Sequence, residues 1–179
     1  MRAMEDQTAF PPVLLQQHFW NVFIVDALIG NWDRHNGNWG FLYNTATDEI
    51  AIAPVYDCGS CLYPQADEAI MRDTIDKQPE RDFRTFSIPL SSIKANGRKI
   101  NYFDFISSLE NADCNKALKR ILPKINMDAI FRIVDETPFI SDLQKQFYKT
   151  MLRTRKERIL DFAREKLRKR EKAKELDAR

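Results

Sequence analysis

The stretch DALIGNWDRHNGNWGFLYN at residues 26–44, followed by IAPVYDCGSCLYP at residues 52–64, is the most informative part of this sequence. Asp33 is followed five residues later by Asn38, and a second aspartate, Asp57, comes after a short segment rich in strand-forming residues. The residues around Asp33 are dense in Asn, Asp and Gly, which indicates a loop. The two stretches therefore predict two carboxylates and one amide on loops at either side of a short hairpin.

Local patterns outside these loops predict mainly helices. Apolar residues recur at helical spacing from Val13 to Gly30, with Pro at the start and Gly at the end, so we expect a largely buried helix there. Two short strands are expected at Gly40 to Tyr43 and at Glu49 to Ala53. Further helices are expected in residues 66–77, from Asn101 or Asp104 to Leu109, in residues 116–125 and 127–136, and after a Ser141–Gln144 capping box. Residues 78–99 are expected to be mostly irregular surface.

The length and the charge distribution favour one domain with a basic end. At 179 residues and 21.0 kDa, the chain is long enough for one domain with its own core. Residues 151–179 hold 12 Lys and Arg against 6 Asp and Glu, although the whole chain has a net charge of only +2. We expect a mainly α lobe over residues 1–150, with residues 151–179 forming a basic helix of the same domain whose end frays or projects into solvent.

The residue types on the two loops suit phosphoryl transfer. That reaction needs a group that orients the attacking hydroxyl and accepts its proton, and oxygen ligands that hold magnesium against the phosphates. Mg²⁺ prefers carboxylates, amide carbonyls and water. We therefore expect Asp33 to be the catalytic base, and Asn38 and Asp57 to hold Mg²⁺ and so bind ATP. His35 is expected either to contact phosphate or to brace the loop, and Arg34 either to stabilise developing charge or to pair with a carboxylate.

The same residues resemble the HipA family of bacterial serine/threonine kinases. Members typically show a DxLIGNxDRHxxNxGF-type loop and then an Ala-Pro segment ending in Asp-x-Gly-Ser. Asp33, Asn38 and Asp57 fall on the family's catalytic and metal positions. The pattern also matches at Asp26, Asn31, His35, Gly59 and Ser60. The departures are Trp32, where Thr is common, and the two cysteines that flank the Gly-Ser pair, Cys58 and Cys61.

The resemblance implies both a fold and a function. The fold would be a kinase-like C-terminal lobe: a helical bundle with a small β-hairpin that carries the catalytic and metal-binding loops. The activity would be transfer of the ATP γ-phosphate to protein Ser or Thr with Mg²⁺, in a possible toxin–antitoxin setting with an antitoxin protein as partner. Phosphoinositide kinases also use a DRHNxN loop, so a lipid or small-molecule kinase stays open.

A complete kinase also needs an N-terminal lobe with a phosphate-covering loop and a lysine that pairs with the phosphates. Residues 1–32 contain no Gly-rich loop and no lysine. We therefore expect the chain to be a fragment, a stand-alone lobe or half of a split pair, and to need an N-terminal kinase lobe for activity. A non-catalytic, partner-binding module derived from a kinase lobe is the alternative.

Several residues have a structural interpretation beside the functional one. Asp26 lies on an otherwise apolar helix face and either touches substrate or, as we prefer, accepts hydrogen bonds from the loop, with Asn31 as further loop support. Cys58 and Cys61 form a CxxC that suits a redox motif or half a zinc site, but two small half-buried residues are the simpler interpretation. The tryptophans beside the loop are expected mainly in the core.

Composition also bounds the location and partners of the protein. Three cysteines fit a reducing cytosol, and the start of the sequence has no apolar signal core, so we expect a cytoplasmic protein with no membrane partner. The basic C-terminal helix intersperses acidic residues at about every fourth position, as in an ordinary surface helix. Direct contact with nucleic acid is therefore not expected.

Overall fold

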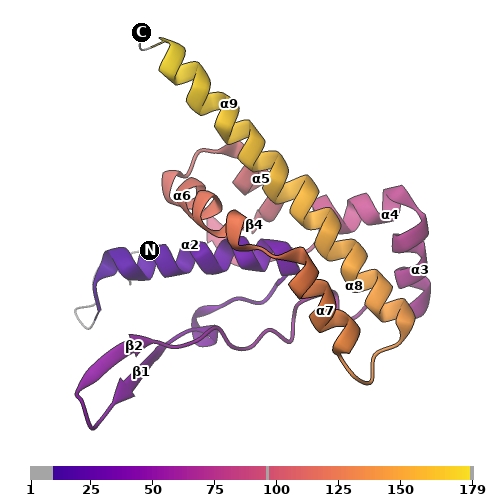
Figure 1. Cartoon of the computed structure of the whole chain (residues 1–179), viewed down its shortest axis with the longest axis horizontal. Coiled ribbons are helices and arrows are strands. Elements are labelled where there is room, and N and C mark those ends of the chain that lie inside the picture. Colours follow the sequence, from indigo (N-terminus) through magenta and orange to yellow (C-terminus); the bar gives the residue numbers. More distant parts are fainter. Residues whose placement is uncertain (1–9, 96, 178–179) are drawn as a thin grey trace.

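A computed structural model describes residues 10–95 and 97–177 of the chain. The fold is mainly α with a small β-hairpin, as the sequence predicted, and it contains a second small antiparallel sheet that the sequence did not predict (Figure 1). The elements are α2 (Pro12–Ile29), η1 (Asn36–Asn38), β1 (Phe41–Asn44), β2 (Glu49–Ile52), α3 (Glu68–Asp76), α4 (Gln78–Asp82), η2 (Phe83–Ser87), β3 (Leu90–Ala95), β4 (Arg98–Asn101), α5 (Tyr102–Ser108), α6 (Ala112–Ile121), η3 (Leu122–Lys124), α7 (Met127–Glu136), α8 (Asp142–Arg155), η4 (Lys156–Asp161) and α9 (Phe162–Asp177).

Helix α2 runs through the core and ends where the predicted catalytic loop begins. Its side chains Phe23, Ile24 and Ala27 are at most 1% exposed, and they share one apolar cluster with residues of α5, α6 and the C-terminal helices. Gly30 follows the helix with φ +64°, a left-handed conformation that glycine adopts without steric cost, and its N–H donates to the Asp26 carbonyl. The buried helix therefore fixes the position of the loop that follows it.

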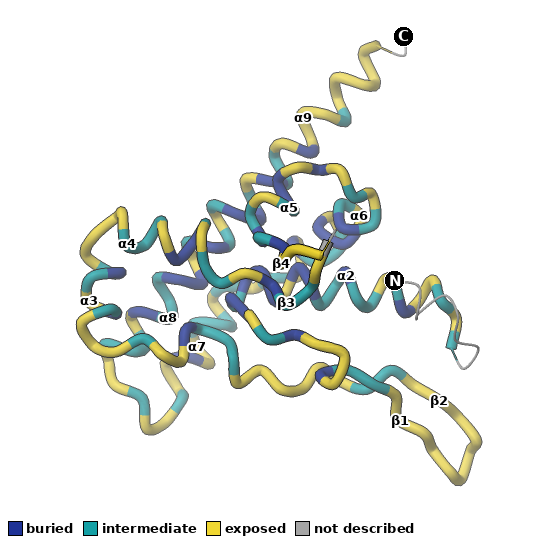
Figure 2. The backbone as a smooth tube through the Cα atoms, turned by 180° about the vertical axis from the view of Figure 1, so that it is seen from behind, coloured by how far each residue is buried: buried dark blue, intermediate teal, exposed yellow. Residues whose placement is uncertain are grey.

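The C-terminal helices form one long rod that crosses the molecule (Figure 1). Helix α8 begins with the predicted capping box, in which Ser141 accepts from the Gln144 N–H and the Gln144 side chain accepts from the Ser141 N–H. Leu152, Ile159 and Ala163 place the middle of the rod in the same core as α2. Beyond this stretch the rod is largely exposed and extends away from the bundle up to Asp177 (Figure 2).

The β1–β2 hairpin projects from the opposite end of the molecule (Figures 1 and 2). Its strands pair antiparallel from Phe41 opposite Ile52 to Asn44 opposite Glu49, which confirms the predicted hairpin to within one residue at each end. Nearly every residue of the two strands is exposed, including apolar ones. The hairpin is therefore held to the bundle mainly through the loops on either side of it.

The prediction that residues 78–99 are mostly irregular was wrong. This segment contains α4, a π-helical turn η2 and strand β3, which pairs with β4 across an irregular register. Side-chain bonds to backbone hold these short elements: Arg81 donates to the Thr74 and Ile75 carbonyls, and Thr85 donates to the Arg81 carbonyl. Such contacts leave no periodic apolar pattern, so hydrophobic spacing could not reveal them.

Candidate phosphoryl-transfer site

A buried ion pair lies beneath the predicted catalytic loop. Asp26 is 1% exposed, and Arg34 donates to both of its carboxylate oxygens, from Nε to Oδ2 at 3.0 Å and from Nη2 to Oδ1 at 3.1 Å. The Asn31 amide adds a third bond to Oδ1 at 2.9 Å. Burial raises the pKa of Asp26, whereas the bonds from Arg34 and Asn31 act against that rise. With three donated bonds, the carboxylate ties the loop to helix α2.

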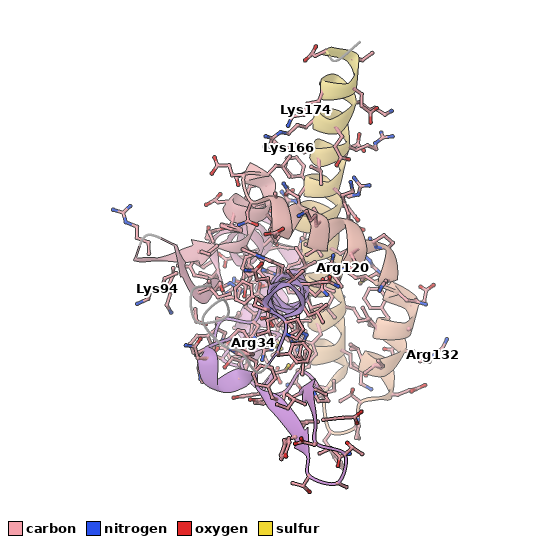
Figure 3. All side chains as sticks on the ribbon, turned by 90° about the vertical axis from the view of Figure 1, so that its left-hand side faces the viewer. Arg34, Lys94, Arg120, Arg132, Lys166 and Lys174 are labelled. Atoms are coloured by element: carbon pink, nitrogen blue, oxygen red, sulfur yellow. The ribbon has the colours of Figure 1, made fainter. Side chains whose placement is uncertain are left out.

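Arg34 also joins the two predicted functional loops to each other. Its Nη1 donates to the carbonyl oxygens of Asn38 at 3.1 Å and Tyr56 at 2.7 Å, and its Nη2 lies 3.6 Å from the Cys58 sulfur. Burial alone lowers the pKa of Arg34, but the Asp26 carboxylate outweighs burial and the pKa is raised. Figure 3 shows Arg34 inside the molecule near the base of the hairpin. Of its two expected uses, the structure therefore shows pairing with a carboxylate.

Asp33 and Asn38 lie on one tightly bonded loop. The Asp33 N–H donates to the Asn31 side-chain oxygen at 3.1 Å, and the Asn38 Nδ2 donates to the Asp33 carbonyl at 2.9 Å. Asp33 is half-buried and Asn38 is buried in the short helix η1. Because the amide nitrogen of Asn38 is already used, its Oδ1 is the atom left to serve as an oxygen ligand.

Asp57 lies on the second loop, directly after a residue that is bonded to the first. The Tyr56 carbonyl accepts from Arg34, and the Tyr56 hydroxyl donates to the Gly37 carbonyl at 3.0 Å. Asp57 itself is exposed and has φ +55°, a left-handed conformation that is uncommon outside glycine.

His35 lies at the exposed rim of the first loop. Its Nδ1 accepts a bond from the Gly37 N–H at 3.0 Å and so caps the short helix η1. The ring therefore braces the loop through one nitrogen, while Nε2 remains for a ligand. Both expected uses of His35 are compatible with this position.

The oxygen ligands available for magnesium are few. Within residues 10–95 and 97–177, no three His, Cys, Asp or Glu side chains are grouped in a way that could hold a metal ion. Asn38 and Asp57 supply one amide oxygen and one carboxylate, a hard donor set that suits Mg²⁺. The ion usually completes its shell with substrate phosphates and water, so a donor set of this size fits a phosphate-bound magnesium.

Sequence reasoning missed two hydroxyl groups that hold the loop from a distance. The Tyr102 hydroxyl donates to the Asn31 carbonyl at 2.6 Å, and the Ser92 hydroxyl donates to the Arg34 carbonyl. Both contacts join residues more than 55 positions apart in the sequence. No local pattern marks either residue, so only the fold could reveal them.

A cleft of about 910 Å³ opens beside the loop. Its walls come from α2, the segment 34–39, strand β3 and helix α5, and most of its lining is apolar, including Phe19, Val22, Trp39 and Ile93. Asp26, Arg34, His35 and Gly37 also line it, whereas Asp33, Asn38 and Asp57 do not. The cleft therefore lies next to the predicted magnesium ligands but does not contain them.

The fold and the two linked loops define a kinase-like lobe, and the comparisons agree with that class. No protein-family profile matches the chain. The chain is 46% identical over 162 residues to the serine/threonine-protein kinase CtkA of Helicobacter pylori strain J99, which covers 90% of this chain and 50% of that protein. A crystal structure of a Helicobacter pylori proinflammatory kinase CtkA superposes with a TM-score of 0.87 at 46% identity, over 91% of this chain and 60% of the other. The chain thus spans about half the length of the curated relative.

No helix within the described part of the chain combines the length and apolar character needed to cross a bilayer.

Proposed function

We propose that this chain is the catalytic-loop half of a HipA-like serine/threonine protein kinase that transfers the ATP γ-phosphate to a protein hydroxyl. The observation that carries the proposal is the Asp26–Arg34 pair, because Arg34 also binds the backbone on both functional loops. One guanidinium thereby holds the Asp33–Asn38 loop and the Asp57 loop in a fixed relation. The likeness to a serine/threonine kinase over 90% of the chain supports the same conclusion.

In this proposal each loop residue has one chemical role. Asp33 orients the Ser or Thr hydroxyl and accepts its proton, and the bonds to its backbone N–H and carbonyl hold the backbone of this residue in place. Asn38, through Oδ1, and Asp57, through its carboxylate, hold Mg²⁺ against the ATP phosphates. When bound, the ion neutralises charge that develops on the transferred group. His35 contacts a phosphate through Nε2.

Asp26 and Asn31 support this site without touching the substrate. Asp26 is buried and its carboxylate is occupied by Arg34 and Asn31, which leaves it poorly suited to bind a substrate. Asn31 uses its side-chain oxygen on the Asp33 N–H. The two residues therefore attach the catalytic loop to the buried helix α2 and limit its movement.

The remaining kinase parts would come from a second lobe. The chain spans about half of the similar kinase, and its hairpin exposes large apolar side chains that a partner could cover. Leu42 and Tyr43 of β1 are each about half exposed, as is Val55 shortly after β2. We propose that an N-terminal kinase lobe packs on this hairpin and completes the ATP site, that residues 1–150 and 151–179 act as one lobe, and that an antitoxin protein restrains the kinase in the cytoplasm.

The test is phosphate transfer with an N-terminal kinase lobe supplied separately. The chain is mixed with the purified N-terminal half of the Helicobacter kinase, labelled ATP, Mg²⁺ and a protein acceptor. We expect label on Ser or Thr in the mixture and little from either part alone. Asp33→Ala should reduce transfer by at least about 100-fold, the usual contribution of a positioned base. Asp76→Ala, an exposed change at the end of α3, serves as the matched control.

The same experiment separates the alternatives. A folded mixture that binds but never transfers phosphate would favour a non-catalytic partner-binding module. Label that appears on phosphoinositides and not on protein would favour a lipid kinase. Full transfer by the Asp33→Ala chain would overturn the assignment of the base.

A further inference from the structure

Two cysteines lie on a tight turn directly after Asp57. Cys58 is exposed and Cys61 is half-buried, and neither is part of a disulfide. The Cys61 N–H donates to the Cys58 carbonyl at 3.1 Å, the bond that closes a four-residue turn. The ends of such a turn lie within about 7 Å between Cα atoms, and disulfides span about 4.4–6.8 Å. The backbone therefore already holds the two residues at bridging distance.

The side chains are close as well. Burial, as the largest cause, and then the neighbouring Cys58 raise the pKa of Cys61 to about 12, so the two thiols interact with each other. Cys58 is an exposed residue, and its sulfur accepts from the Arg34 guanidinium at 3.6 Å. Cys58 is thus the thiol that a small oxidant reaches first, and Cys61 is the neighbour in position to close the bond.

Neither thiol has another evident use. Phosphoryl transfer with magnesium draws on oxygen ligands, and soft sulfur is a poor ligand for that ion. A zinc site would need more ligands, and no cluster of His, Cys, Asp and Glu that could hold a metal occurs among the residues that the structure describes. The third cysteine, Cys114, is 2% exposed in the apolar core of α6. It provides an internal control for thiol chemistry.

We propose that Cys58 and Cys61 form a reversible oxidation site that a peroxide converts to an intramolecular disulfide. The Cys58 sulfur attacks one peroxide oxygen, so an S–O bond forms, the O–O bond breaks and one water leaves. The Cys61 sulfur then displaces the oxygen from Cys58, so the S–S bond forms and a second water leaves with the remaining thiol proton. A dithiol reductant restores both thiols.

The disulfide would link the two ends of the turn that follows Asp57. It would also convert the Cys58 thiol, which contacts Arg34, into a disulfide sulfur. This inference goes beyond the proposed kinase activity, because the bond can be measured without any phosphate transfer. A failed kinase assay and a failed disulfide assay therefore report on separate claims.

The test is thiol counting on the full chain. The reduced protein is treated with hydrogen peroxide, quenched with catalase, denatured and alkylated with N-ethylmaleimide for intact-mass measurement. We expect three alkyl groups before oxidation, one after oxidation, and three again after dithiothreitol. The tryptic peptide 35–72 contains Cys58 and Cys61 and no other cysteine, so it should lose two hydrogen masses.

Single variants assign the bond. Cys58→Ser and Cys61→Ser should each abolish the intramolecular product, while Cys114→Ala should still form it. The inference is overturned if oxidised wild-type protein still takes up three alkyl groups, if the bond joins two chains, or if Cys58 reaches the sulfinic acid while Cys61 stays free. The wild-type peptide map decides the question even where a variant fails to fold.

Discussion

At the scale of single residues, the site depends on a charge pair that is hidden from solvent. Asp26 was noticed in the sequence as an aspartate on an apolar helix face, and Arg34 was noticed because it lies in the predicted catalytic loop. The pairing itself was open, since eight residues and a helix end separate the two side chains. Tyr102 and Ser92, which bind the same loop, had no signal in the sequence because their contacts depend on the path of the whole chain.

Removing the Asp26 charge should destabilise the fold. In Asp26→Asn the Arg34 guanidinium stays buried without its carboxylate, and breaking such a pair costs about 3–5 kcal/mol of unfolding free energy. Urea unfolding measures the change. Asp73→Asn is the matched control, because its pair with Lys77 is exposed and should contribute little to stability. Equal losses in the two variants would contradict the special role of the buried pair.

His18 should make stability fall as the solution becomes more acidic. Burial lowers the pKa of His18, and the positive charge of Arg34 lowers it further. The unfolded chain then binds the proton more readily than the folded one, so stability is lost as pH drops from above about 6.5 through the lowered folded value. Melting temperatures at pH 8 and pH 5.5 should therefore differ less in His18→Gln than in wild type.

A matched substitution at the exposed neighbour Gln17 should leave the wild-type pH dependence intact. Identical pH dependence in His18→Gln and wild type would show that His18 does not contribute.

At the scale of elements, the sequence predicted what local patterns control. The α2 helix, the β1–β2 hairpin and the α8 capping box follow from apolar spacing, turn residues and capping residues, and all three were confirmed. Residues 78–99 were misread because α4, η2 and β3 depend on side-chain bonds to neighbouring backbone. Intrinsic secondary-structure propensities of single residues do not reveal such bonds.

The α8 capping box gives a prediction at this scale. Ser141→Ala leaves the Gln144 N–H without its side-chain acceptor and should lower the unfolding free energy by about 1 kcal/mol. Urea denaturation detects a change of this size. Gln146→Ala, an exposed change within the same helix, should have little effect. A Ser141→Ala protein as stable as wild type would show that the helix start is held by other contacts.

At the scale of the whole molecule, one buried arginine connects the C-terminal rod to the site. Arg155 of α8 is 1% exposed and donates to the Ala27 carbonyl at 2.7 Å and to the Tyr63 hydroxyl at 3.0 Å. The first contact lies at the end of α2 and the second follows the Asp57 loop. Arg155 thus links three segments that are far apart in the sequence, and the local sequence pattern around it did not predict these contacts.

Replacing Arg155 should loosen this connection. In Arg155→Met the Ala27 carbonyl loses its buried donor, and an unsatisfied group of this kind costs about 1–3 kcal/mol. The Tyr63 hydroxyl also loses a donor but keeps its own bond to the Arg84 carbonyl. We therefore expect urea denaturation to show a loss of about 1–3 kcal/mol of unfolding free energy. Arg153→Met, at an exposed arginine two residues earlier, is the control. If the two variants lose the same unfolding free energy within experimental error, the linking role of Arg155 is contradicted.

The proposed roles of Asp33 as base and of Asn38 and Asp57 as magnesium ligands are tested most directly by a magnesium titration. The titration measures γ-phosphate transfer with an N-terminal lobe supplied. Asp57→Asn replaces a charged carboxylate by a neutral amide, a weaker ligand, and Asn38→Ala removes an oxygen ligand. In both variants the Mg²⁺ concentration for half-maximal transfer should rise by about tenfold or more. Asp33→Asn should instead lower the maximal rate by at least about 100-fold while the Mg²⁺ requirement stays the same. Wild-type magnesium dependence in the Asp57 and Asn38 variants, or a wild-type rate in Asp33→Asn, would contradict the proposed site.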